Sequence, residues 1–140
     1  QHQIIDGLMK TKISLISISK KIDGGDIWIK EDLSLSGDNM KAVFNNLEES
    51  SILLLNNFFD KKGVIVRKKQ DLSTGSYYKR RTPKESKIAL STFTEKPLNE
   101  IYDFIRSLTD PYPNAYIEDK EGNKLYFKGV SFKKTNTFNE

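Results

Sequence analysis

Apolar and polar side chains alternate over residues 13–18, apart from one extra isoleucine, and a second apolar run, 27–29, follows a polar stretch. A period of two is typical of a β-strand. The connection contains Asp23, Gly24 and Gly25, and glycine supplies the positive φ that reversals of the chain need. The pattern predicts two strands joined by a turn that carries Asp23.

The longest amphipathic pattern predicts a helix over 40–58, because apolar residues recur there at intervals of three or four. The preceding segment 36–38, Ser-Gly-Asp, offers side chains that cap helix N-termini, and Gly63 is typical of a helix end. The branched residues at 64–66 then predict a short strand. The apolar stripe of the helix consists of Met40, Val43, Phe44, Leu47, Leu54, Leu55 and Phe58.

The remaining elements are shorter. Residues 1–7 are typical of the tail of a helix that Gly7 ends, and Pro97 fits the first turn of another. The buried face of that later helix is predicted to contain Leu98, Ile101, Tyr102, Ile105 and Leu108. Strands are predicted at 115–118 and 125–132, and 133–140 is expected to be an irregular tail.

Together these elements predict a mixed α/β fold, with a boundary between two lobes in the polar, basic segment 70–87. The predicted strand at 13–18 has too few partners within the chain to cover both of its faces. We therefore expect the chain alone to be marginally stable, or to pair with another polypeptide.

Composition limits the class of protein. The chain has 140 residues, no cysteine and a formal net charge of +4, so a disulfide framework is excluded and a reducing compartment is permitted. The longest apolar run, 52–55, is far too short for a membrane span, and no signal-peptide pattern opens the chain. The first residue is not Met and already lies within an apolar pattern, which we interpret as the mark of a fragment.

Basic charge is concentrated in residues 61–87, which hold ten Lys and Arg against only Asp71 and Glu85. A solvated loop explains such a block as well as a site for an anionic ligand does, and both interpretations stay open.

Three motifs occur at separated positions. Residues 22–27 read Ile-Asp-Gly-Gly-Asp-Ile, residues 78–86 read Tyr-Lys-Arg-Arg-Thr-Pro-Lys-Glu-Ser, and residues 108–116 read Leu-Thr-Asp-Pro-Tyr-Pro-Asn-Ala-Tyr. In this order they resemble the formyltransferases that use N10-formyltetrahydrofolate. The second and third resemble the branch that formylates amino sugars, with Asn114 in place of the usual glycine.

The resemblance implies the later half of a formyltransferase Rossmann-like domain, residues 1–69, followed by a small α+β C-terminal lobe, residues 70–140. The absent N-terminal half would carry the first parallel strands and the family's Asn-x-His-Pro segment. His2 is the only histidine in the sequence and does not stand in that motif. We do not expect it to be the catalytic base, and the fragment alone is expected to be inactive.

The resemblance also implies a reaction: transfer of a formyl group from N10-formyltetrahydrofolate to the amine of an amino sugar, without a metal, in the cytoplasm. Asp23 matches the family's catalytic aspartate, which orients the histidine, whereas Asp26 is interpreted as structural. The folate-lining residues are Ser19, Lys20, Lys21, Ile22 and Asp23, and the sugar-branch motif supplies Arg80, Arg81 and Thr82 as substrate-binding residues.

Two other classes of function stay open. The basic block, with Tyr77 and Tyr78, also suits an RNA-binding module or an enzyme like methionyl-tRNA formyltransferase. An assembly module, in which an exposed sheet edge pairs two copies as a homodimer, is the third hypothesis.

Overall fold

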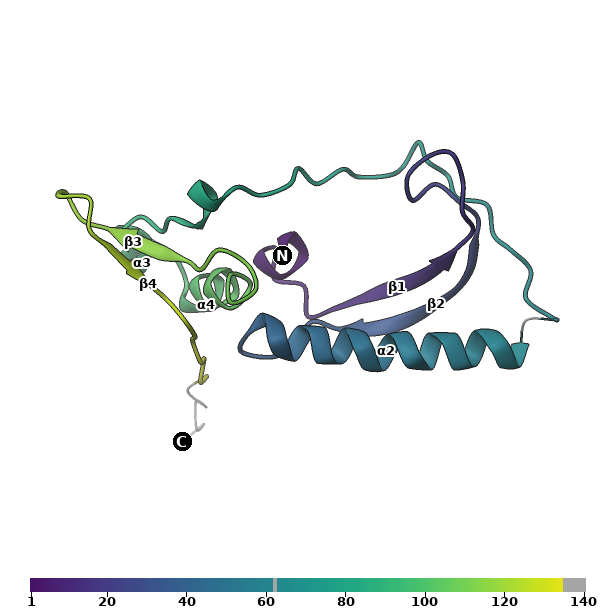
Figure 1. Ribbon diagram of the computed structural model, residues 1–140. Coiled ribbons are helices and arrows are strands. Elements are labelled where there is room, and N and C mark those ends of the chain that lie inside the picture. The colour runs from purple at the N-terminus through teal and green to yellow at the C-terminus, as the bar shows by residue number, and fades with distance from the viewer. Residues whose placement is uncertain (62, 135–140) are drawn as a thin grey trace, which may run out of the picture. The chain divides into compact units, whose positions relative to one another are not determined.

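The computed structural model describes residues 1–61 and 63–134, which form two compact units (Figure 1). We call Met9–Ser36 with Val43–Arg80 the hairpin unit. Gln1–Leu8, Gly37–Ala42 and the chain from Arg81 onward form the C-terminal unit. The two units are described separately.

The hairpin unit is built on two antiparallel strands, β1 (Lys10–Ile16) and β2 (Ile27–Ser34). The register shifts between Leu15 and Ile16, which marks a β-bulge next to the connecting loop. The strand-turn-strand prediction is confirmed, but the first strand ends two residues early. Ile18 is fully exposed instead of continuing the strand.

Helix α2 (Met40–Lys61) begins in the C-terminal unit and continues into the hairpin unit, where it runs beside the two strands (Figure 1). Two side-chain amides join it to β2. Asn57 donates to the Glu31 carboxylate at 2.9 Å, and Asn46 donates to the Ser34 carbonyl at 3.2 Å.

The predicted N-cap of α2 was placed too early. The helix begins at Met40, and the Asn39 side chain accepts the hydrogen bond of the Ala42 backbone amide at 2.9 Å. Asp38, which the sequence suggested for this role, instead accepts a hydrogen bond from the Tyr102 hydroxyl at 2.5 Å. The Asp38 side chain therefore binds a partner that is distant in the sequence and does not cap the helix.

The predicted strand at 64–66 is wrong. The backbone amides of Val64 and Ile65 both donate to the Lys61 carbonyl, which makes this segment the turn that ends α2. The chain pairs with β2 slightly later, where Lys68 forms an isolated antiparallel bridge with Ile27. Branched side chains favour a strand only where a partner strand is available, and here the partner meets residue 68.

The C-terminal unit contains short elements around one apolar core. They are α1 (His2–Ile5), the 3-10 turn η1 (Pro83–Ser86), α3 (Thr92–Glu95), α4 (Leu98–Arg106), β3 (Tyr116–Glu118) and β4 (Lys124–Tyr126), with β3 and β4 antiparallel. The buried core consists of Ile88, Ile101, Ile105, Leu108 and Ala115.

Most predictions for this unit are confirmed, with two differences. Leu98 is exposed rather than part of the buried face of α4, because it lies at the first residue of the helix. The second strand of the hairpin ends at Tyr126 instead of residue 132. The irregular tail was predicted for 133–140, of which 135–140 lie outside the described residues.

A buried cation organises the C-terminal unit. The Arg106 side chain is 1% exposed, and its Nε donates to the Asp103 carboxylate at 2.6 Å. Its Nη1 also donates to the Gly37 carbonyl at 3.1 Å, and the guanidinium lies 5.3 Å from the Tyr102 ring centre. Burial, followed by the hydrogen bond to Asp38, raises the pKa of the Tyr102 hydroxyl to about 12.

We predict that Asp103→Ala destabilises the full-length protein by about 3 kcal/mol or more, because it leaves the Arg106 charge buried without its anion. Glu100→Ala is the matched control on the same helix. It removes the partner of an exposed pair with Lys96 and should cost about 0.5 kcal/mol or less. Urea unfolding of both variants checks this, and equal losses would contradict it.

Candidate functional site

The loop between β1 and β2 carries the predicted catalytic aspartate. Asp23 has a left-handed backbone, with φ of +54°, and no other non-glycine residue of the described chain has a positive φ. Asp23 is the third residue of a turn that the Gly24 amide closes by donating to the Lys21 carbonyl at 3.1 Å. Aspartate is among the few residues that tolerate this conformation, so its identity here has a local reason besides chemistry.

Gly25 closes the loop through a close approach of two backbones. A Cβ atom on residue 25 would lie 1.7 Å from the Ser17 carbonyl oxygen, so only glycine fits. Ser17 also accepts a hydrogen bond on its hydroxyl from the Trp28 indole at 2.9 Å, and its amide donates to the Asp26 carbonyl at 2.9 Å. The two ends of the loop are therefore held together.

The predicted folate-lining residues share this loop. Ser19, Lys20, Lys21, Ile22 and Asp23 are all exposed. The Ser19 hydroxyl donates to the Lys21 carbonyl at 2.7 Å, which folds the segment on itself, and the Ile22 side chain is 81% exposed. The Asp23 carboxylate makes no hydrogen bond or ion pair to the described residues, so no side chain of this part neutralises it.

Gln70, which the sequence did not indicate, also belongs to this site. Its side-chain amide donates to the carbonyl oxygens of Asp23 and Gly25. The residue lies in a polar segment that we interpreted as a boundary between lobes, and no periodic pattern marks it. Only a structure places it against the loop.

The sugar-branch motif is divided between the two units. Arg80 lies in the hairpin unit and is exposed, with no hydrogen bond or ion pair to the described residues. Arg81 lies in the C-terminal unit, where its Nη2 donates to the Glu85 carbonyl at 2.5 Å and its guanidinium lies 5.5 Å from the Phe104 ring centre. Its Nε is buried and has no hydrogen-bond partner among the described residues.

Thr82 is engaged within its own turn. Its hydroxyl donates to the Glu85 carboxylate at 2.9 Å, its backbone amide donates to the same oxygen at 2.5 Å, and Pro83 begins η1. These contacts form the capping pattern of a helix start. The threonine therefore fixes the conformation of the motif.

Asn114, the departure from the third motif, is buried and has a structural role. Its side-chain amide donates to the Leu108 carbonyl at 3.2 Å, to the Asp110 carboxylate at 3.2 Å and to the Tyr112 carbonyl at 3.3 Å. The Ser86 hydroxyl donates to the Pro113 carbonyl at 3.1 Å, which connects the second motif with the third.

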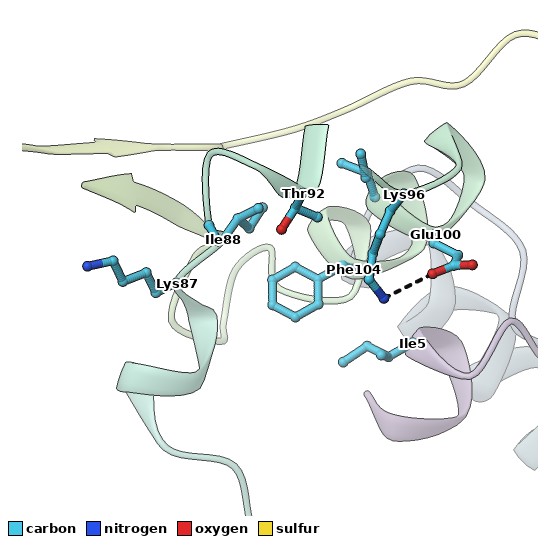
Figure 2. A pocket seen from close by; sticks show the side chains of 9 residues that line it. Ile5, Lys87, Ile88, Thr92, Lys96, Glu100 and Phe104 are labelled. Atoms are coloured by element: carbon cyan, nitrogen blue, oxygen red, sulfur yellow. Dashed lines mark hydrogen bonds and ion pairs between the residues drawn. The ribbon is translucent and has the colours of Figure 1, made fainter. Parts of the chain in front are cut away.

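The C-terminal unit also has a hollow of about 190 Å³ beside α4, lined on several sides by apolar groups such as Ile5, Ile88 and Phe104 (Figure 2). The ammonium group of Lys96 at its rim is paired with Glu100 at 3.1 Å. Its charges are therefore satisfied internally, and we assign it no ligand.

Two further classes of site are absent from the described part of the chain. No helix there combines the length and the apolar character that crossing a bilayer requires. Among residues 1–61 and 63–134, no three His, Cys, Asp or Glu side chains gather in a way that would hold a metal ion.

The chain is similar to part of several known proteins. No protein-family model matches the chain. Its homologues and structural neighbours include methionyl-tRNA formyltransferases and sugar N-formyltransferases, and the chain corresponds to their C-terminal part. The resemblance expected from the three motifs, and the fold it implied, are thus confirmed.

The names of the individual relatives mention two kinds of formyl acceptor, methionyl-tRNA and a sugar. The methionyl-tRNA formyltransferase of Sulfurihydrogenibium sp. (strain YO3AOP1) is 30% identical over 124 residues, which cover 86% of this chain and 38% of that protein. The structure of the methionyl-tRNA formyltransferase from Clostridium thermocellum matches with a TM-score of 0.73 and 32% identity, over 94% of this chain and 55% of that one.

Two other solved structures share the fold at lower identity. A sugar N-formyltransferase from Shewanella sp. FDAARGOS_354 has a TM-score of 0.69 and 18% identity, over 95% of this chain and 55% of that one. HypX from Aquifex aeolicus, in complex with tetrahydrofolic acid, has a TM-score of 0.59 and 14% identity, over 84% of this chain and 20% of that one.

We predict that Gly25→Ala opens the loop, because the overlap with the Ser17 carbonyl is between backbone atoms and no side-chain rotation relieves it. The Ser17 amide should exchange with solvent about tenfold faster or more in the full-length protein. Gly75→Ala, in the same unit, is the control, since its Cβ would lie 3.6 Å from the nearest atom. Equal protection of Ser17 in both variants would count against the prediction.

Proposed function

We propose that the full-length protein containing these residues transfers a formyl group from N10-formyltetrahydrofolate to the amine of a nucleotide-linked amino sugar, in the cytoplasm. The observation that carries the proposal is the exposed, unpaired carboxylate of Asp23 on a loop whose backbone is fixed on both sides. The formyltransferase relatives support the reaction class.

The chemistry explains why a fixed carboxylate is needed. The attacking ammonium must lose a proton, and the carbonyl of the formyl group must accumulate negative charge as the tetrahedral intermediate forms. We assign to Asp23 the orientation of a histidine outside these 140 residues, which accepts the proton. A carboxylate that hydrogen-bonds one imidazole nitrogen fixes which nitrogen remains basic.

We assign the folate to the same loop. Residues 19–22 present backbone groups in a folded, exposed segment, and such groups suit the amide-like edge of a pterin. The tetrahydrofolate complex of HypX, whose fold resembles this one, supports a folate in this class of structure. Asp23 follows directly and would lie beside the formyl-bearing end of the donor.

The amino sugar is assigned to the basic motif. Arginine forks suit a diphosphate better than lysine does, because their donors are paired and planar. Arg80 is exposed and has no hydrogen bond or ion pair to the described residues, so its guanidinium is open to an anion. The Arg81 guanidinium already donates to the Glu85 carbonyl, and its charge would support the binding of the same anion. Thr82 would act through the conformation of the turn that follows them.

We predict that Asp23→Asn lowers kcat of the full-length protein by about 10²-fold or more with formyl-folate and an accepted amino sugar. Asparagine tolerates the same left-handed backbone, so the change removes the charge and leaves the loop intact. Asp26→Asn is the control in the same loop, and it should change kcat less than about threefold. Full activity of Asp23→Asn would remove this residue from the mechanism.

The acceptor is tested in parallel assays of the full-length protein. We expect formylation of a nucleotide-linked amino sugar and none of methionyl-tRNA. The methionyl-tRNA relative and the basic segment 61–87 favour the opposite outcome, and binding of tRNA that weakens steeply with salt would support it. Formylation of methionyl-tRNA alone would overturn the sugar assignment and keep the formyltransferase.

A further inference from the structure

We propose that Gln70 is a positioning residue for Asp23, and that its side-chain amide holds the loop in the backbone conformation that presents the carboxylate. This inference rests on the proposed function, since that function gives Asp23 its role. The two residues are 47 positions apart in the sequence and belong to the same compact unit.

The contact consists of two hydrogen bonds from one atom. Nε2 of Gln70 donates to the Asp23 carbonyl oxygen at 2.8 Å and to the Gly25 carbonyl oxygen at 2.5 Å. A primary amide nitrogen carries two hydrogens, so one glutamine satisfies both acceptors. Because the two carbonyls lie on either side of Gly24, the tip of the loop is tied at two points to one atom.

The position of Gln70 follows from the pairing that precedes it. The backbones of Ile27 and Lys68 exchange hydrogen bonds in both directions, each 2.8 Å long. In that antiparallel register residue 70 lies opposite residue 25. The bridge therefore brings the Gln70 side chain to the loop.

Aromatic contacts anchor the same segment. The Arg67 guanidinium lies 5.0 Å from the centre of the Trp28 ring, and Trp28 packs edge to face on Phe58 at 5.6 Å. These contacts connect the segment that carries Gln70 with β2 and with α2. The amide thus reaches the loop from a supported backbone.

The backbone of Asp23 needs such a contact. A left-handed conformation is unfavourable for a residue with a Cβ atom, and it persists where surrounding interactions over-determine it. The orientation of the Asp23 carbonyl depends on its own ψ angle, and Gln70 fixes that orientation. Since the Asp23 carboxylate has no hydrogen-bond or ion-pair partner among the described residues, this part of the chain constrains it only through the backbone from which the side chain projects.

The consequence concerns the chemical step more than binding. A carboxylate that orients a base must lie within hydrogen-bond reach of it, and a displacement of about 1 Å costs up to about 10²-fold in rate. Loss of the Gln70 amide should therefore lower kcat, whereas KM for the amino sugar, which we assign to another segment, should change little.

The test uses Gln70→Met in the full-length protein, because methionine has a similar length and no donor. We expect amide exchange at Gly24 and Gly25 to rise about tenfold, and kcat to fall about tenfold or more. In an Asp23→Asn background, Gln70→Met should cause no further loss of kcat. A residue with only a general structural role would lower kcat in both backgrounds.

Asn57→Leu provides the matched control, since it also removes a side-chain amide from the hairpin unit but acts on Glu31 at another position. It should leave both the exchange at Gly24 and kcat unchanged. Unchanged exchange in Gln70→Met would overturn the contact, and an unchanged kcat, or equal losses with and without Asp23, would overturn the positioning role. If Asp23→Asn is fully active, the proposed function of Asp23 fails, whereas the exchange data still decide whether Gln70 holds the loop.

Discussion

The Ser17 carbonyl occupies the space in which a side chain of residue 25 would lie, and the loop that carries Asp23 depends on that contact. The close approach brings the two ends of the β1–β2 connection together and leaves the tip, around Asp23, to be fixed from outside by Gln70. A rigid tip and an unpaired carboxylate are what an orienting group requires, because its effect depends on position and on having lone pairs free for a partner.

In the C-terminal unit, a buried charge fixes the positions of distant segments. Arg106 joins α4 to the segment before α2 through Asp103 and the Gly37 carbonyl, so a single guanidinium connects parts of the chain that are far apart in sequence. Such a group contributes less net stability than an apolar residue would, but it fixes which carbonyl and which carboxylate meet. The turn that contains Arg81 and Thr82 belongs to the same unit.

The three motifs that indicated the family combine chemistry with structure. Gly25 is required by a backbone contact, Thr82 by the cap of η1, and Asn114 by carbonyls and a carboxylate at the end of α4. Four charged groups of these motifs, those of Asp23, Asp26, Arg80 and Lys84, have no hydrogen-bond or ion-pair partner among the described residues. The contacts therefore separate motif residues that have a structural reason from those whose charge is open to a partner.

Local pattern was sufficient for the elements whose signal lies within the element. The alternation before Asp23, the stripe of α2 and the apolar face of α4 each predicted an element correctly, because one face of each is less exposed than the other. Pattern failed where a distant partner decided the outcome. Asp38 accepts a hydrogen bond from Tyr102, and Asn39 caps α2 in its place. Residue 68, instead of residues 64–66, pairs with β2.

Periodicity, and glycine at a reversal of the chain, were enough to predict the hairpin, the long helix and the position of the candidate aspartate. The tertiary structure alone decided what holds that aspartate. No sequence pattern around Gln70 indicates its role. Its side-chain amide reaches the loop only because the antiparallel bridge between residues 27 and 68 brings it opposite residue 25.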